Sequence, residues 1–262
     1  MSTDRLFLTF THLNDATRHA EYNAWHQLDH LPENALLPGV AWGDRWVRTP
    51  RCAAAGHVGD DAYAPVQYAV AYGFRAPLES ALREWTDLNQ RALWWGRRPE
   101  LPWTERRPVG FFHPVKEYAA PRVLVAAAAL PHRPHRGVHL TLSRTAAPAE
   151  LAGAARFAAL DRELIPAVLA VPGVAGAATY RFAEGAGGFG SPAGSADDGL
   201  TVRVLYLDGD VLETSARVED ARPDWIGRDS APGDAEHVLL STPMLSIRPW
   251  EWDWFDGGRP RL

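Results

Sequence analysis

Cysteine is nearly absent from this sequence, since Cys52 is the only one among 262 residues. A single cysteine excludes an internal disulfide and any metal cluster built on cysteine ligands, and it fits a reducing compartment. The surrounding segment "TPRCAAAG" is typical of a loop and has no histidine beside it, so we do not expect Cys52 to act as a nucleophile.

Long apolar segments and basic runs are also missing. The longest apolar stretch, Val123 to Leu130, is far shorter than the ~20 residues that span a bilayer, and "MSTDRLFLTF" lacks a signal-peptide pattern. The net charge is −5, and the 27 Lys and Arg residues are dispersed, which disfavours nucleic acid as a partner. We therefore expect a cytoplasmic protein that associates with neither membranes nor nucleic acid.

The common hydrolase, nucleotide and zinc motifs do not occur. Gly185, Gly187 and Gly190 have the spacing of a dinucleotide-binding loop, but "SPAGSADDG" follows them where a helix is required. The segment "HRPHRGVH" carries three histidines without a nearby carboxylate, so it is interpreted as a solvated connector rather than a metal site. These patterns lead us to expect neither a cofactor nor a metal.

What the sequence does contain is an internal repeat. "LPGVAW" and "VPGVAG" align with Pro38 on Pro172, 134 positions apart, and the same offset without gaps relates Pro32 to Pro166 and Tyr72 to Tyr206. We therefore predict a duplicated chain, with residues 1–130 as the first unit and residues 131–262 as the second. The second unit is interpreted as the scaffold half and ends in a Trp-rich tail.

Each half shows the same order of signals. In the first half, strands at 5–13, 40–49, 66–74 and 107–115 alternate with helices at 16–36 and 77–95. This β-α-β-β-α-β order, repeated in the second half, is typical of the ferredoxin-like unit in the α+β class. Extra strands are predicted at 122–130 and 250–255. One face of each antiparallel sheet is apolar, so we expect the two sheets to pack face to face within one chain.

One pattern of the first half is shared with a known family. It consists of Trp25, His26, His30, Leu31, Pro32, Pro38, Gly39, Val40 and Arg45. With these residues the first half resembles the EthD-like branch of the dimeric α+β barrel superfamily, and the second half resembles it only in the order of its elements. The resemblance implies a fused, intramolecular barrel with a small-molecule pocket. Such families include cofactor-independent oxygenases, isomerases and polyketide-tailoring dehydratases of secondary metabolism, and related barrels hold haem, so a haem ligand role for His26 or His30 stays open. A homodimer of the fused unit is also possible.

The first helix carries the candidate catalytic residues His30, His26 and Asp29. On a helical wheel, Ala20, Ala24, Leu28 and Leu31 form an apolar stripe, and the two histidines lie nearly opposite. In the second half, His26 and His30 are replaced by Leu160 and Leu164, which predicts that their face is at least partly buried. Burial lowers a histidine pKa and a carboxylate such as Asp29 raises it, so we expect proton exchange near neutrality. The alternative is that His30 only caps the helix end.

Aromatic residues concentrate in the first half, which holds seven of the eleven tryptophans before residue 104. This distribution favours a pocket for an aromatic ligand there, although dense core packing would give the same pattern. Arg45 holds a carboxylate or enolate in one interpretation and a surface salt bridge in the other. Arg97, Arg98, Arg106 and Arg107 form either a rim for an anionic substrate or a solvated loop. The predicted substrate-binding residues are Trp25, Tyr22, Trp42, Arg45, Tyr68, Tyr72 and Trp94.

The sequence thus predicts a cofactor-independent enzyme for a small aromatic or polyketide-like substrate, of dehydratase, cyclase, isomerase or oxygenase type. Histidine acid–base chemistry would drive its reaction. The alternative is a non-catalytic small-molecule binding protein of the same fold.

Overall fold

The computed structural model describes residues 3–145, 151–186, 199–222 and 236–255. It is a mixed α+β protein built on one large antiparallel sheet. The elements, in chain order, are β1 (Arg5–Leu13), η1 (Ala16–Arg18), α1 (His19–Trp25), η2 (His26–His30), α2 (Leu31–Ala35), β2 (Val40–Val47), α3 (Pro50–Ala55), β3 (His57–Val58), η3 (Asp61–Tyr63), β4 (Tyr68–Phe74), α4 (Leu78–Trp94), β5 (Thr104–Ala119), η4 (Ala127–His132), β6 (Gly137–Thr145), α5 (Leu151–Ala159), η5 (Leu160–Leu164), α6 (Ile165–Ala170), β7 (Val174–Gly185), β8 (Leu200–Leu207), α7 (Val211–Asp220) and β9 (Glu236–Ser246).

The strands form a single sheet rather than two separate ones. Their order is β2-β4-β1-β5-β7-β8-β6-β9-β3, and β2 also pairs with β9 at Trp46–Ser246 and Val47–Leu245. The long pairing of β5 with β7 joins the strands of the two halves at the other junction. The sheet therefore closes into a barrel, and closure leaves only short edges unpaired. The expected intramolecular barrel is thus formed by one continuous sheet instead of two separate sheets packed face to face.

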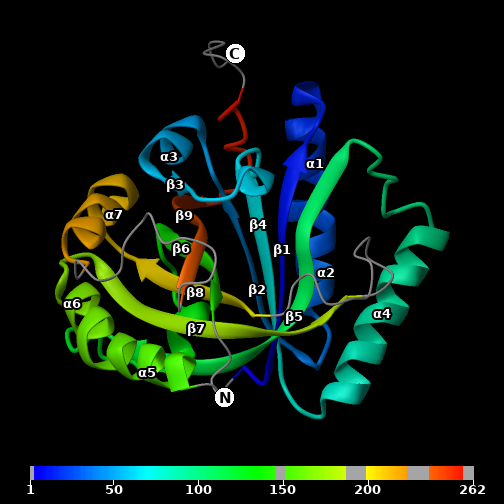
Figure 1. Ribbon diagram of the computed structural model, residues 1–262. Coiled ribbons are helices and arrows are strands. Elements are labelled where there is room, and N and C mark those ends of the chain that lie inside the picture. The colour runs from blue at the N-terminus through cyan, green and yellow to red at the C-terminus, as the bar shows by residue number, and fades with distance from the viewer. Residues whose placement is uncertain (1–2, 146–150, 187–198, 223–235, 256–262) are drawn as a thin grey trace.

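Strand alternation sorts the apolar side chains into an inner and an outer layer. Leu6, Leu8 and Phe10 of β1 point into the barrel and meet Leu140 and Leu142 of β6 in the main core. The helices lie outside: α1, α2 and α4 cover strands of the first half, whereas α5, α6 and α7 cover strands of the second (Figure 1). Any cavity between a helix and the sheet is thus separate from the barrel interior.

A wide helical turn precedes the proline in both long helical segments. The N–H of Leu31 donates to the carbonyl of His26, and the N–H of Ile165 donates to that of Leu160, each five residues back. Pro32 and Pro166 follow at once; a proline has no N–H, and its ring crowds the carbonyl four residues earlier. The π-helical turns η2 and η5 relieve this crowding and leave the chain free to continue as α2 and α6.

The strand register corrects the ungapped offset between the halves. Gly43 pairs with Tyr72, and Ala177, which lies 134 positions after Gly43, pairs with Leu205 rather than Tyr206. Tyr206 faces the barrel core, whereas Tyr72 and Leu205 face the helices. A shift of one residue moves a side chain to the other face of a sheet, so the structural counterpart of Tyr72 is Leu205.

Three local predictions are wrong. Cys52 is buried in helix α3, which Thr49 caps by accepting the N–H of Cys52, and not in a loop. Residues 122–130 and 250–255 form no strands; the 3₁₀ turn η4, which contains Pro131, begins at Ala127 instead. His135 of the supposed solvated connector is buried and binds Asp44 and Trp46 of β2. Gly187 and Gly190 of the glycine motif lie outside the described residues.

No helix within the described residues is long and apolar enough to cross a membrane.

Candidate functional site

A cavity lies between the first helical segment, the sheet and α4 in the first half. The space that the centre of a water-sized sphere can occupy is about 40 Å³, inside an envelope of about 480 Å³ that opens to solvent. This room suits a few waters or a small planar ligand admitted by modest side-chain movement. The lining residues are Phe7, Thr9, Thr11, Tyr22, Trp25, His26, His30, Val70, Tyr72, Trp85, Asn89, Arg98, Leu101, Thr104 and Arg106.

The first helical segment turns its histidine face toward the cavity, whereas Ala20 and Leu28 of the apolar stripe are exposed and Leu31 packs against the core. His26 is only 6% exposed and Tyr22 only 3%, whereas Leu28 is 44% exposed. The helical wheel alone would have placed the histidines in water, and the comparison with the leucines of the second half is what indicated burial. The two imidazole rings meet edge to face with centroids 4.9 Å apart, and Trp25 stacks on His30 at 4.8 Å.

Asn34 fixes the tautomer of His30. Its amide nitrogen lies 2.5 Å from the His30 carbonyl oxygen and 3.2 Å from Nδ1 of the same ring. The carbonyl can only accept, so the amide NH₂ faces it, and the same NH₂ then donates to Nδ1. Since Nδ1 accepts, the proton of the neutral ring is on Nε2. His30 is thereby set up as a hydrogen-bond donor through that nitrogen.

His26 has the opposite arrangement. Its Nε2 lies 3.5 Å from the hydroxyl of Tyr72, and burial raises the pKa of that phenol well above its usual value. Tyr72 therefore keeps its proton, and its hydroxyl can donate to Nε2 or accept from it, weakly at this distance, according to the tautomer of His26. In the tautomer with the proton on Nδ1, the two imidazoles differ in role, with Nε2 of His26 as an acceptor and Nε2 of His30 as a donor.

Both histidines are neutral at neutral pH. Burial and then the charges of Arg98, Arg45 and Arg106 lower the pKa of His30 from 6.5 to about 3. Burial, followed by the Arg45 charge, lowers the pKa of His26 well below its usual value. Asp29 was expected to raise these pKa values, but it lies on the outer helix face, where its carboxylate pairs with Arg97 at 2.6 Å. Asp29 is therefore outside the cavity.

Arg45 lies behind the histidines and is 1% exposed. It donates to the amide oxygens of Asn23 at 3.0 Å and Gln27 at 3.3 Å, and its guanidinium lies over the ring of Tyr22. The prediction of a surface salt bridge is wrong for this residue. Alternation along β2 sends Arg45 toward the helices and the neighbouring Trp46 into the barrel core.

Of the predicted substrate-binding residues, Trp25, Tyr22 and Tyr72 line the cavity. Trp42 lies in the barrel core, where its indole N–H donates to Thr3. Tyr68 lies beside the cavity wall and binds His19 and Asn23. Trp94 is 74% exposed on the outer face of α4, because its position on the helix points away from the sheet.

Several lining residues were not predicted as site residues. Trp85 and Asn89 are one helical turn apart on the buried face of α4, and a polar Asn on an otherwise apolar stripe was the available signal. Arg98 and Arg106 come from the arginine-rich stretch, for which the sequence left a rim and a solvated loop open. The structure places these two at the cavity, whereas Arg97 pairs with Asp29 and Glu33 outside it.

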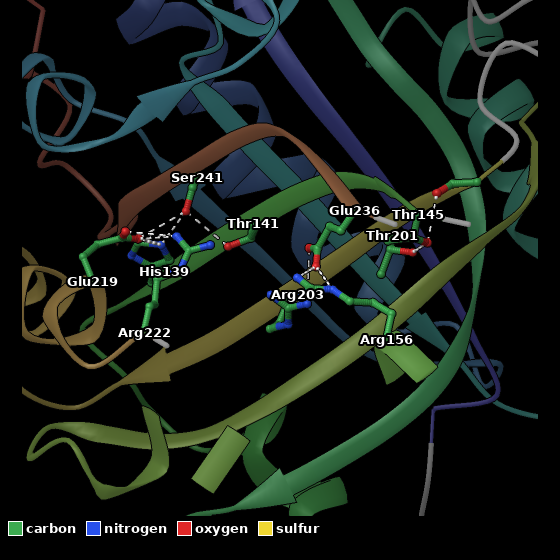
Figure 2. Close-up of polar contacts among 11 residues, drawn as sticks. His139, Thr141, Thr145, Arg156, Thr201, Arg203, Glu219, Arg222, Glu236 and Ser241 are labelled. Carbon is green, nitrogen blue, oxygen red and sulfur yellow. Dashed lines mark hydrogen bonds and ion pairs between the residues drawn. The ribbon is translucent and has the colours of Figure 1, made fainter. Parts of the chain in front are cut away.

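The corresponding helix-facing layer of the second half contains a buried ionic network (Figure 2). His139 pairs with Leu205 on the sheet, as Phe7 pairs with Tyr72, and its Nε2 contacts both Ser241 and Glu219. Only about 10 Å³ of free space remains there. The second half is thus filled by leucines on the helical segment and by ion pairs on the sheet side, and not by leucine alone.

Two carboxylates hold this network together. Glu219 pairs with Arg222 at 3.0 Å, and Glu236 pairs with Arg203 and Arg156 (Figure 2). Burial would raise the pKa of Glu236, but the neighbouring arginines bring it down to about 2. Each buried guanidinium of this cluster therefore has a negative partner.

A separate hollow under α5 is lined by Phe157, Leu160 and Tyr118. It is larger, since the centre of a water-sized sphere can occupy about 320 Å³ there. Its lining includes no histidine. Within the described part of the chain, no group of three or more His, Cys, Asp or Glu side chains is placed to hold a metal ion. The first cavity is also too small for a porphyrin, so the geometry does not favour haem ligation by His26 or His30.

Neither a family model nor a curated protein matches this chain. Among solved structures, an anthrone oxidase-like protein is similar at 12% identity, with 95% of this chain and 94% of that one covered and a TM-score of 0.47. A chlorite dismutase from Candidatus Nitrospira defluvii is 11% identical, with coverages of 92% and 91% and a TM-score of 0.47. A dye-decolorizing protein from V. cholerae is 11% identical, with 94% of both chains covered and a TM-score of 0.47.

Proposed function

We propose that the protein is an enzyme that moves a proton on a small aromatic or polyketide-like molecule held in the first-half cavity. His26 accepts the proton through Nε2, and His30 donates a hydrogen bond through Nε2 to the substrate oxygen that becomes negative. The observation that carries this proposal is the placement of two neutral imidazoles in one cavity, with Nδ1 of His30 held by Asn34 and Nε2 of His26 facing a hydroxyl that can donate to it. Neighbouring groups whose environments give them different roles are the pattern of an acid–base site.

The charges that form during such a step offset each other. Abstraction of a proton makes His26 positive while the substrate oxygen becomes negative, so the cavity gains an ion pair instead of an isolated charge. Dehydration, cyclisation, isomerisation and cofactor-independent oxygenation all begin with a proton transfer of this kind. In this proposal the chain is two fused ferredoxin-like units of the EthD-like type, of which the first kept the site.

Exchange of the protons of an aromatic ketone for deuterium tests the proposal without knowledge of the natural substrate. Acetophenone in D₂O exchanges its methyl protons slowly, and ¹H NMR follows their loss. We expect the protein to accelerate exchange and His26→Leu to reduce the acceleration by about 100-fold or more. Leucine is the residue at the equivalent place in the second half. His113→Leu, at an exposed position on β5, is the matched control and keeps the wild-type rate.

A non-catalytic binding protein is the second candidate, because the same cavity suits it equally in shape. If acetophenone binds, as seen by quenching of Trp25 and Trp85 fluorescence, and its exchange is not accelerated, the binding function replaces the catalytic one.

A further inference from the structure

Positive charge gathers around the first-half cavity. Arg98 and Arg106 line it, and Arg45 lies directly behind His26 and His30. Arg98 and Arg106 are close enough that the charge of Arg106 adds to burial in lowering the pKa of Arg98. No aspartate or glutamate is among the lining residues that the structure describes.

Two arginines near this cavity lack the carboxylate partners that buried arginines have in the second half. There, Arg203 and Arg222 bind Glu236 and Glu219. Arg45 instead has only neutral amide oxygens as hydrogen-bond acceptors. The side chain of Arg106 makes no hydrogen bond or ion pair within the described residues. Since a buried cation without a counter-charge is costly, an anion in the cavity would stabilise this arrangement.

The walls specify the rest of the ligand. The rings of Phe7, Tyr72 and Trp85 line the cavity and pack together with centroids 4.9–6.3 Å apart. Such a wall favours a flat apolar body through stacking and edge contacts. The polar groups that converge on the cavity are guanidinium and imidazole N–H donors, which match oxygen anions.

We infer that the first-half cavity selects an aromatic ligand that carries an oxygen anion, a carboxylate or an enolate, and that Arg98 and Arg106 bind this anion. The inference rests on the proposed function for the site and names its substrate class. The anion lies at the end of the cavity where the arginines meet the imidazole pair. The positive field adds to burial in lowering the pKa of His30, because a protonated ring there would be repelled by the same arginines.

Binding of benzoate and benzamide compares charge at nearly constant shape. We expect benzoate to bind about 10-fold to 100-fold more tightly than benzamide in isothermal titration calorimetry. One or two hydrogen bonds to a charged group contribute a difference of this size. Arg98→Gln and Arg106→Gln should each remove most of that preference. Arg107→Gln, on the same strand but exposed, is the matched control and should leave it unchanged. Melting temperatures establish that each variant is folded.

Equal affinity for the two probes, or an equal effect of Arg107→Gln, would overturn the inference. Failure of both probes to bind while acetophenone exchange is accelerated would overturn it as well, and would leave the catalytic proposal intact. A second readout separates anion binding from a structural role of the arginines. Bound benzoate offsets their charge, so the pKa of His30, followed by NMR, should rise on binding in the wild type and shift much less in Arg98→Gln.

Discussion

Removal of His30 should make the protein more resistant to mild acid. The folded protein holds the pKa of His30 at about 3, whereas the unfolded chain restores about 6.5. The unfolded state therefore binds the extra proton first, and stability falls as the pH drops below about 6.5 until the folded pKa is reached. Each pKa unit corresponds to about 1.4 kcal/mol, so His30 alone costs about 2 kcal/mol of unfolding free energy between pH 7 and pH 5.

Urea unfolding at pH 7, 6 and 5 measures this loss directly. His30→Leu should lose about 2 kcal/mol less than the wild type over that range, because leucine has no proton to gain. His113→Leu on the exposed side of β5 should lose as much as the wild type. If His30→Leu and the wild type show the same dependence on pH, the ring of His30 is already solvated and the burial argument for the cavity is refuted.

Three further substitutions test the packing. Glu236→Gln should cost about 3–5 kcal/mol in urea unfolding, because Arg203 and Arg156 stay buried without their carboxylate; exposed Glu213→Gln should cost little. Gly73→Ala should cost about 1–3 kcal/mol, since the new Cβ would lie 2.2 Å from the indole nitrogen of Trp42, and an unchanged melting temperature would contradict this. Trp94→Ala should change neither stability nor benzoate affinity, because that ring is in solvent.

The order of strands and helices could be predicted because periodicity is a local property of the sequence. The β-α-β-β-α-β pattern appears in both halves in the element order. The closure of the sheet could not be predicted in this way. It depends on the pairing of β5 with β7 and of β2 with β9, which are contacts between segments far apart in the chain.

The site was only partly predictable for the same reason. The comparison with Leu160 and Leu164 predicted that His26 and His30 are at least partly buried, and the structure has His26 buried and His30 half-buried. Asp29 and Trp94 lie outside the cavity because of their angular positions on their helices. Asp29 also forms an ion pair there with Arg97, which comes from a segment distant in sequence. Arg45 was hardest to interpret, because a charged residue on a strand is usually at the surface, and its amide partners come from the helical segment above it.

The two halves fill corresponding spaces with different chemistry. On the first-half sheet, Phe7 and Val70 occupy the positions that His139 and Arg203 occupy on the second. The polar groups of the first half are on its helical segment and surround an open cavity, whereas those of the second half are on its sheet and neutralise one another. An ion-paired layer with little free space leaves no room for a ligand, whereas a layer around an open cavity lined by arginines is suited to one.

A crystal structure of the protein with benzoate tests the central claim most directly. The account predicts benzoate in the first-half cavity, with its carboxylate against Arg98 and Arg106 and its ring between the helical segment and the sheet. Benzoate bound instead in the hollow under α5, or a first-half cavity that stays without it at saturating concentration, would contradict the account.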